Sequence, residues 1–124
     1  VELRRDMGHE VVLTHGGTVR FGSQSLVTVG LSDDRSEIVL KRSAASNPQI
    51  PHFERETRAR RRCAADEATI RLIVDQASVE LFADDGEIYM AAHTLPAGED
   101  ETVTVEAFGS NMGVAPFAVP KRSD

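Results

Sequence analysis

The stretch at residues 70–87, which reads IRLIVDQASVELFADDGE, decides the fold. Ile70, Leu72 and Val74 share one face of a first strand, and Val79 and Leu81 share one face of a second. Residues 85–86, an Asp-Gly pair, favour a tight hairpin turn because such a turn needs residues that accept a positive φ. A third apolar run follows at residues 88–90. The stretch therefore predicts three consecutive short strands.

The rest of the chain has the same period of two, which predicts nine or ten strands about 8–12 residues apart. A single domain fits the length of 124 residues. We therefore expect an all-β fold, an antiparallel two-sheet β-sandwich of the jelly-roll or concanavalin-like type, over residues 1–124, with 1–17 as a boundary segment. The further expected strands lie at residues 11–13, 18–21, 53–63, 103–105 and 114–119, with a hairpin at 25–41 and a loop at 43–51.

The net charge of −6 is unevenly distributed. Residues 1–65 hold 11 basic and 8 acidic side chains, whereas residues 66–124 hold 3 basic and 12 acidic ones. An acidic total argues against nucleic-acid binding, which needs a basic surface, and no apolar run is long enough for a membrane helix. Because the chain starts at Val1 rather than at Met, we expect it to be part of a longer protein.

An arginine-rich run extends from Arg55 to Arg62. The guanidinium group of arginine binds anions through paired N–H donors, so a phosphate or acidic-polymer site is one interpretation of the run. The other is a solvated strand face that is paired with acidic neighbours on the next strand. We favour the second, since the whole chain is acidic.

Residues for nucleophilic or metal chemistry are present without the spacing that such sites need. Ser110 lies directly after Gly109 rather than in a G-x-S-x-G motif, and Cys63 has no obvious base. The histidines do not have metal-ligand spacing, and the acidic residues 99–101 are more typical of a solvated loop than of a Ca²⁺ site. The four histidines are His9, His15, His52 and His93. We predict no catalytic, metal or cofactor site.

Two pairs of carboxylates could serve glycosidase chemistry, which needs two carboxyl groups around the scissile bond. They are Asp75 with Glu80, and Asp84 with Asp85. The second pair lies in the predicted turn, where Asp usually binds backbone groups. Asp75 and Glu80 have apolar neighbours, so we expect them to have architectural roles and to be bound by backbone N–H groups or an arginine.

Residues 70–87 resemble the C-terminal β-sandwich module of glycoside hydrolase family 32, which includes invertases, levanases, inulinases and sucrose-6-phosphate hydrolases. The family pattern reads roughly L-R-I-x-V-D-x-S-S-V-E-V-F-x-N-D-G. Ala77 stands where Ser is usual, and Asp84 where Asn is usual. Weaker similarities at residues 38–43 and 95–96 extend the resemblance to residues 25–108. The positions on the pattern are Asp75, Ser78, Glu80, Phe82, Asp85 and Gly86.

The resemblance implies that catalysis lies in an N-terminal five-bladed propeller. The propeller's motifs, of the types W-x-N-D-P-N-G, R-D-P and E-C, do not occur in this sequence. The resemblance therefore implies a non-catalytic accessory module of a fructan- or sucrose-cleaving enzyme, with the propeller as partner. Ile73 and Phe82 make the second face of their strands apolar, so we expect these strands to be covered on both sides. The parent would be extracellular as a levanase or inulinase, and cytoplasmic as a sucrose-6-phosphate hydrolase.

Two other functions stay open. An independent fructan-binding module would need aromatic platforms, and the chain has no Trp and only one Tyr, Tyr89. A self-sufficient hydrolase would rest on Asp75 and Glu80. An isolated module could also form a homodimer.

Overall fold

The computed structural model describes residues 1–4, 8–23, 25–44, 55–62, 67–95, 97–98, 101–109 and 112–117. In these residues the chain forms strands and no helix, and therefore no helix that could cross a membrane. The strands are β1 (Glu2–Leu3), β2 (Gly8–Leu13), β3 (Gly16–Phe21), β4 (Ser25–Leu31), β5 (Glu37–Ala44), β6 (Arg55–Arg60), β7 (Ile70–Val74), β8 (Ser78–Ala83), β9 (Ile88–His93), β10 (Val103–Ala107) and β11 (Met112–Phe117).

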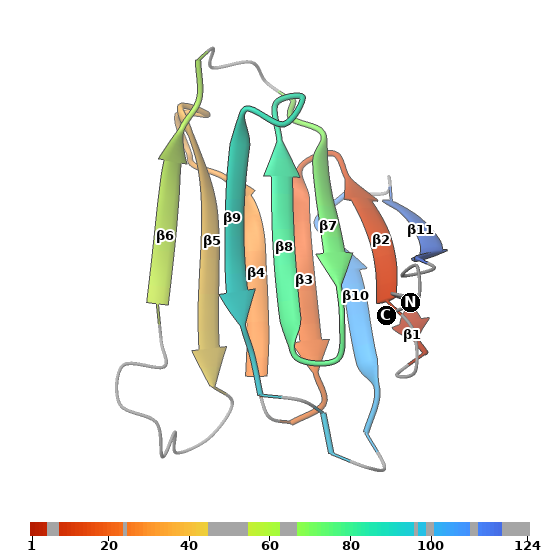
Figure 1. Ribbon diagram of the computed structural model, residues 1–124. Coiled ribbons are helices and arrows are strands. Elements are labelled where there is room, and N and C mark those ends of the chain that lie inside the picture. The colour runs from red at the N-terminus through yellow and green to blue at the C-terminus, as the bar shows by residue number, and fades with distance from the viewer. Residues whose placement is uncertain are drawn as a thin grey trace, which may run out of the picture.

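The strands form two antiparallel sheets that face each other (Figure 1). The six-stranded sheet has the order β1-β10-β3-β4-β5-β6, and the five-stranded sheet has the order β11-β2-β7-β8-β9. The predicted two-sheet sandwich is thereby confirmed. The strand β1 was not predicted, and β3 begins at Gly16, two residues before the strand expected at 18–21.

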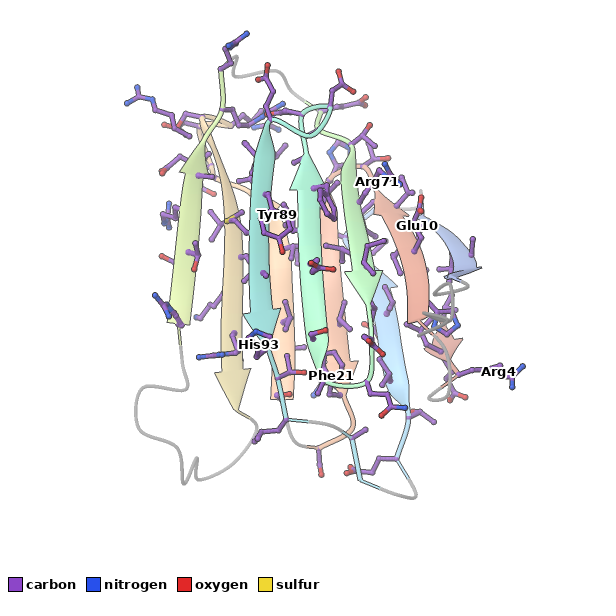
Figure 2. All side chains as sticks on the ribbon, viewed as in Figure 1. Arg4, Glu10, Phe21, Arg71, Tyr89 and His93 are labelled. Carbon is purple, nitrogen blue, oxygen red and sulfur yellow. The ribbon has the colours of Figure 1, made fainter. Side chains whose placement is uncertain are left out.

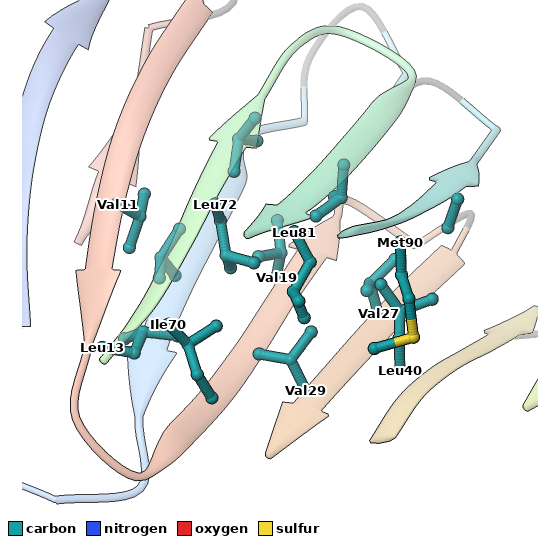
Figure 3. Close-up of a cluster of buried hydrophobic side chains, with 14 of the residues drawn as sticks. Val11, Leu13, Val19, Val27, Val29, Leu40, Ile70, Leu72, Leu81 and Met90 are labelled. Atoms are coloured by element: carbon teal, nitrogen blue, oxygen red, sulfur yellow. The ribbon is translucent and has the colours of Figure 1, made fainter. Parts of the chain in front are cut away.

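The core lies between the sheets because each strand turns its apolar positions inward. In β7, Ile70, Leu72 and Val74 are buried while Arg71 is exposed. The register places Leu72 of β7 opposite Leu81 of β8, so that equivalent faces match across the sheet. Figure 3 shows how side chains from both sheets meet in this layer.

Gly17 allows β3 and β10 to approach closely. A Cβ atom at Gly17 would collide with the backbone carbonyl oxygen of Glu106 in the adjacent strand β10. Only a residue without a side chain fits there, so glycine at position 17 is required for the packing of β3 against β10.

Candidate functional site

The hairpin that the sequence predicts at Asp85-Gly86 joins β8 to β9. Its turn residues Asp84, Asp85 and Gly86 have φ values of 51°, 56° and 87°. Asp and Gly tolerate this left-handed region better than most residues, which explains why they occur here. The turn is closed by the backbone N–H of Gly86, which donates to the carbonyl of Ala83 at 3.2 Å.

The same turn holds a partly buried ion pair. Arg61, whose side chain is 3% exposed, donates from Nε and Nη2 to the carboxylate of Asp84 at 3.0 and 3.2 Å. Its two terminal nitrogens also donate to the carbonyls of Arg35 and Glu67, each at 3.1 Å. Arg61 therefore ties the end of β6, in one sheet, to the β8–β9 turn, in the other.

The two carboxylates of the proposed glycosidase pair lie in different surroundings. Asp75 is exposed in the turn between β7 and β8 and accepts a hydrogen bond from the backbone N–H of Gln76 at 2.7 Å. Glu80 is half-buried within β8 and accepts a hydrogen bond from the hydroxyl of Tyr89 at 2.7 Å. The prediction that both lie among apolar neighbours is wrong for Asp75, because its position is beyond the end of β7. The backbone partner expected for it is present.

Tyr89 of β9 packs against Phe82 of β8. Its ring centroid lies 5.1 Å from that of Phe82, with 55° between the ring planes. The hydrogen bond to Glu80 raises the pKa of the Tyr89 hydroxyl above its usual value of 10.0, since the anionic acceptor stabilises the protonated phenol. Tyr89 is nevertheless 54% exposed.

These residues belong to the outer side of the five-stranded sheet, which we call the five-stranded face. One row of this face crosses four strands in register, with Val12, Arg71, Phe82 and Tyr89 in succession. Ile73 lies in the neighbouring row, between Glu10 and Glu80. Figure 2 labels Glu10, Arg71 and Tyr89 on this face. Because Ile73 and Phe82 are half-buried, the second side of β7 and β8 is only partly covered within this chain.

An ion pair joins β2 and β7 on the five-stranded face. Arg71 donates from Nη2 to the carboxylate of Glu10 at 3.1 Å. The remaining side chains of the row are apolar or aromatic, which is unusual for the water-facing side of an antiparallel sheet. This row is therefore less polar than the water-facing side of an antiparallel sheet usually is.

The arginine-rich run forms the edge strand β6, and part of its charge is paired with acidic neighbours. Arg58 contacts Glu56 at 2.9 Å and Glu37 of β5 at 3.4 Å, and these carboxylates, Glu56 first, raise the pKa of its guanidinium above the usual value. Arg62 contacts Glu87 at 3.4 Å. These pairs agree with a solvated strand face, the interpretation favoured from the sequence.

A groove of about 560 Å³ lies on the outer side of the six-stranded sheet. Gly30, Val39 and Arg58 line it in register across β4, β5 and β6. Phe108, just after β10, is held by its backbone N–H, which donates to the carbonyl of Gly16 at 3.0 Å. Its side chain is next to Gly30, where an added Cβ would lie 3.6 Å from the ring atom Cε2. Phe108 was not predicted from the sequence as a functional residue. The sequence feature that could have indicated it is an aromatic residue directly after the alternating pattern of β10.

The loop between β4 and β5 closes one end of this groove and is fixed by Asp34. Its carboxylate accepts hydrogen bonds from the hydroxyls of Ser32 and Ser36 at 2.9 and 2.6 Å, and from the backbone N–H of Ser36 at 3.0 Å. These donors, led by the Ser36 hydroxyl, lower the pKa of Asp34 from 3.8 to about 2.

Several residues considered from the sequence lie outside the described ranges: His52, Cys63, Pro96, Glu99, Asp100 and Ser110. Among the residues that the structure describes, no group of three His, Cys, Asp or Glu side chains is placed to hold a metal ion. His9 is buried, whereas His15 and His93 are exposed and lie on other strands or turns.

The comparisons with known proteins bear on both the sequence and the fold. The family model described as "Glycosyl hydrolases family 32 C terminal" matches residues 11–119. No curated protein matches the chain. A solved structure of a functionally unknown protein from Saccharomyces cerevisiae is similar, with a TM-score of 0.54, 11% sequence identity, and coverage of 95% of this chain and 63% of the yeast chain. At that identity the likeness concerns the fold alone.

Proposed function

The chain belongs to the C-terminal domains of glycosyl hydrolase family 32, and on that premise we propose that it is the accessory module of a fructan- or sucrose-hydrolysing enzyme. In this proposal it packs on a propeller-type catalytic domain, stabilises it, and has no catalytic activity of its own. The chain spans about 63% of the length of the similar yeast protein.

The composition of the five-stranded face is the observation that carries the proposal. The outer side of the six-stranded sheet is mostly polar, with Thr18, Thr28 and Lys41 among its side chains, as expected for a surface in water. The five-stranded face instead combines an arginine with Phe82 and Tyr89, residue types that dominate the energetics of protein interfaces. We therefore assign this face as the surface that contacts the catalytic domain.

The hydrogen bonds of Asp75 and Glu80 support the non-catalytic part of the proposal. Asp75 binds a backbone N–H in its own turn, and Glu80 binds the neighbouring Tyr89. Each carboxylate thus has a partner that serves the local structure. Architectural roles for Asp75, Ser78, Glu80, Phe82, Asp85 and Gly86 are part of this proposal.

The proposal is tested by the thermal inactivation of the enzyme that contains both domains. Ile73→Lys places a cation on the five-stranded face between Glu10 and Glu80, whose carboxylates are its neighbours on the adjoining strands. The matched control is Thr18→Lys on the other sheet, where Glu106 is the neighbour across the β3–β10 pair.

Removing the buried surface of one isoleucine and adding a charge costs about 2 kcal/mol or more at a contact surface. We therefore expect Ile73→Lys to shorten the half-life of activity at elevated temperature at least tenfold, and Thr18→Lys to leave it unchanged. Equal half-lives for the two variants would refute this assignment of the contact face. A gene that encodes no catalytic domain beside this module would refute the proposed function itself.

A further inference from the structure

We propose that the groove on the six-stranded sheet is a binding site for a neutral oligosaccharide. The groove is formed by β4, β5, β6, the β4–β5 loop and Phe108, and its volume of about 560 Å³ is in the range of small-molecule sites. It lies on the outer side of the sheet opposite the five-stranded face, so the inference stands independently of the proposed contact with a catalytic domain.

The first argument is an exposed aromatic side chain next to an apolar floor. Phe108 is 60% exposed although its backbone is fixed to Gly16. Because Gly30 has no side chain, the ring lies close to its backbone, and Val39 of β5 is paired with Gly30. An exposed ring beside small apolar residues suits the C–H face of a sugar ring, which buries apolar area against an aromatic ring.

The second argument is the set of polar groups around the groove. Among the described residues, neither the carboxylate of Asp33 nor the ammonium of Lys41 has a hydrogen-bond or ion-pair partner. Arg58 is held in place by Glu56 and Glu37. Carboxylates accept and cations donate hydrogen bonds, so these groups together match the hydroxyls of a sugar, which do both.

The third argument is the charge of the groove, which selects against other ligands. Its lining holds the carboxylates of Asp33, Asp34, Glu37 and Glu56 but only two cations, Lys41 and Arg58. A net negative groove repels phosphorylated or acidic polymers. The described residues also provide no metal cluster. A neutral, hydroxyl-rich ligand fits these conditions.

Titration calorimetry on the chain tests the inference with oligosaccharides of three to six units built from fructose, glucose or xylose, and with a lysine-rich peptide as the competing occupant. Three variants locate the site. Phe108→Ala removes the aromatic surface, and Tyr89→Ala is the matched control because it removes a similarly exposed aromatic residue from the opposite face. Gly30→Val fills the groove without removing any polar group, and its Cβ would have ordinary contacts at 3.4 and 3.6 Å.

We expect millimolar or tighter binding of at least one of these oligosaccharides. Phe108→Ala should weaken it about tenfold or more, Gly30→Val should abolish it without changing the melting temperature, and Tyr89→Ala should leave it unchanged. The inference is overturned if none of the oligosaccharides binds, if only the peptide binds, or if Tyr89→Ala rather than Phe108→Ala weakens the binding.

Discussion

The partly buried pair of Arg61 and Asp84 makes a direct prediction about stability. Replacing Arg61 with Ala leaves the carboxylate of Asp84 and the carbonyls of Arg35 and Glu67 without their donor. The side chain of Arg61 is 3% exposed and that of Asp84 is 20% exposed, so solvent replaces the lost donors only in part. We therefore expect Arg61→Ala to be strongly destabilising.

The magnitude follows from the burial of the two partners. Breaking a buried ion pair by removing one partner costs about 3–5 kcal/mol. Because Asp84 retains some contact with water, we take the lower end, about 3 kcal/mol, which corresponds to a fall of about 10 °C in the melting temperature of a domain of this size. Asp84→Asn keeps a residue that accepts a positive φ and one acceptor oxygen, so its cost should be about half as large.

Thermal unfolding followed by circular dichroism, with urea unfolding as a second measure, checks these values. The matched control is Arg62→Ala in the next position, whose side chain is 84% exposed and pairs with Glu87 at the surface. Such surface pairs contribute about 0–1 kcal/mol. If Arg61→Ala and Arg62→Ala melted within about 2 °C of each other, a difference that corresponds to well under 1 kcal/mol, the central role of the Arg61 network would be refuted.

Three further predictions concern other parts of the molecule. Because the folded-state pKa of Asp34 is lowered to about 2, its ionised carboxylate contributes fully to the stability of the fold above pH 3.8, and this stabilisation is lost as the pH falls towards 2. The difference in melting temperature between the parent and Asp34→Ala should therefore be larger at pH 6 than at pH 2. An equal difference at the two pH values would contradict this prediction. Glu80→Gln should lower the pKa of Tyr89, the only tyrosine, in an absorbance titration, and an unchanged pKa would show that the hydrogen bond is absent in solution. Gly17→Ala should destabilise the fold by about 1–3 kcal/mol in urea unfolding, whereas Gly113→Ala, where no atom lies within 4 Å of the added Cβ, should be nearly neutral; equal effects would argue against the close approach of β3 and β10.

Much of the fold could be predicted from the sequence because alternation and turn residues act locally. The period of two identifies β7 and β8, and the Asp-Gly pair identifies the turn after them. The register then follows, since a shift by one residue would expose Leu72 and Leu81. The strand β1 was missed because two residues are too few to show an alternation of apolar and polar side chains.

The functional surfaces could be predicted only in part. Ile73 and Phe82 indicated an apolar second face, but the position of Glu10 and Val12 beside β7 depends on the pairing of β2 with β7, which are far apart in the sequence. Arg61 directly follows β6 and is buried by an ion pair whose partner, Asp84, is 23 residues away in the sequence. Contacts of this range depend on how the two sheets are stacked, which a local pattern does not determine.

The central claim is that the five-stranded face contacts a catalytic domain, and direct binding tests it most sharply. The catalytic domain encoded with this module is titrated with the separate chain and with its Ile73→Lys variant by calorimetry at several temperatures. The account predicts binding with a negative heat-capacity change, because apolar surface is buried, and at least tenfold weaker binding of Ile73→Lys, about 1.4 kcal/mol. Equal affinities of the chain and the variant, or no binding of either, would contradict it.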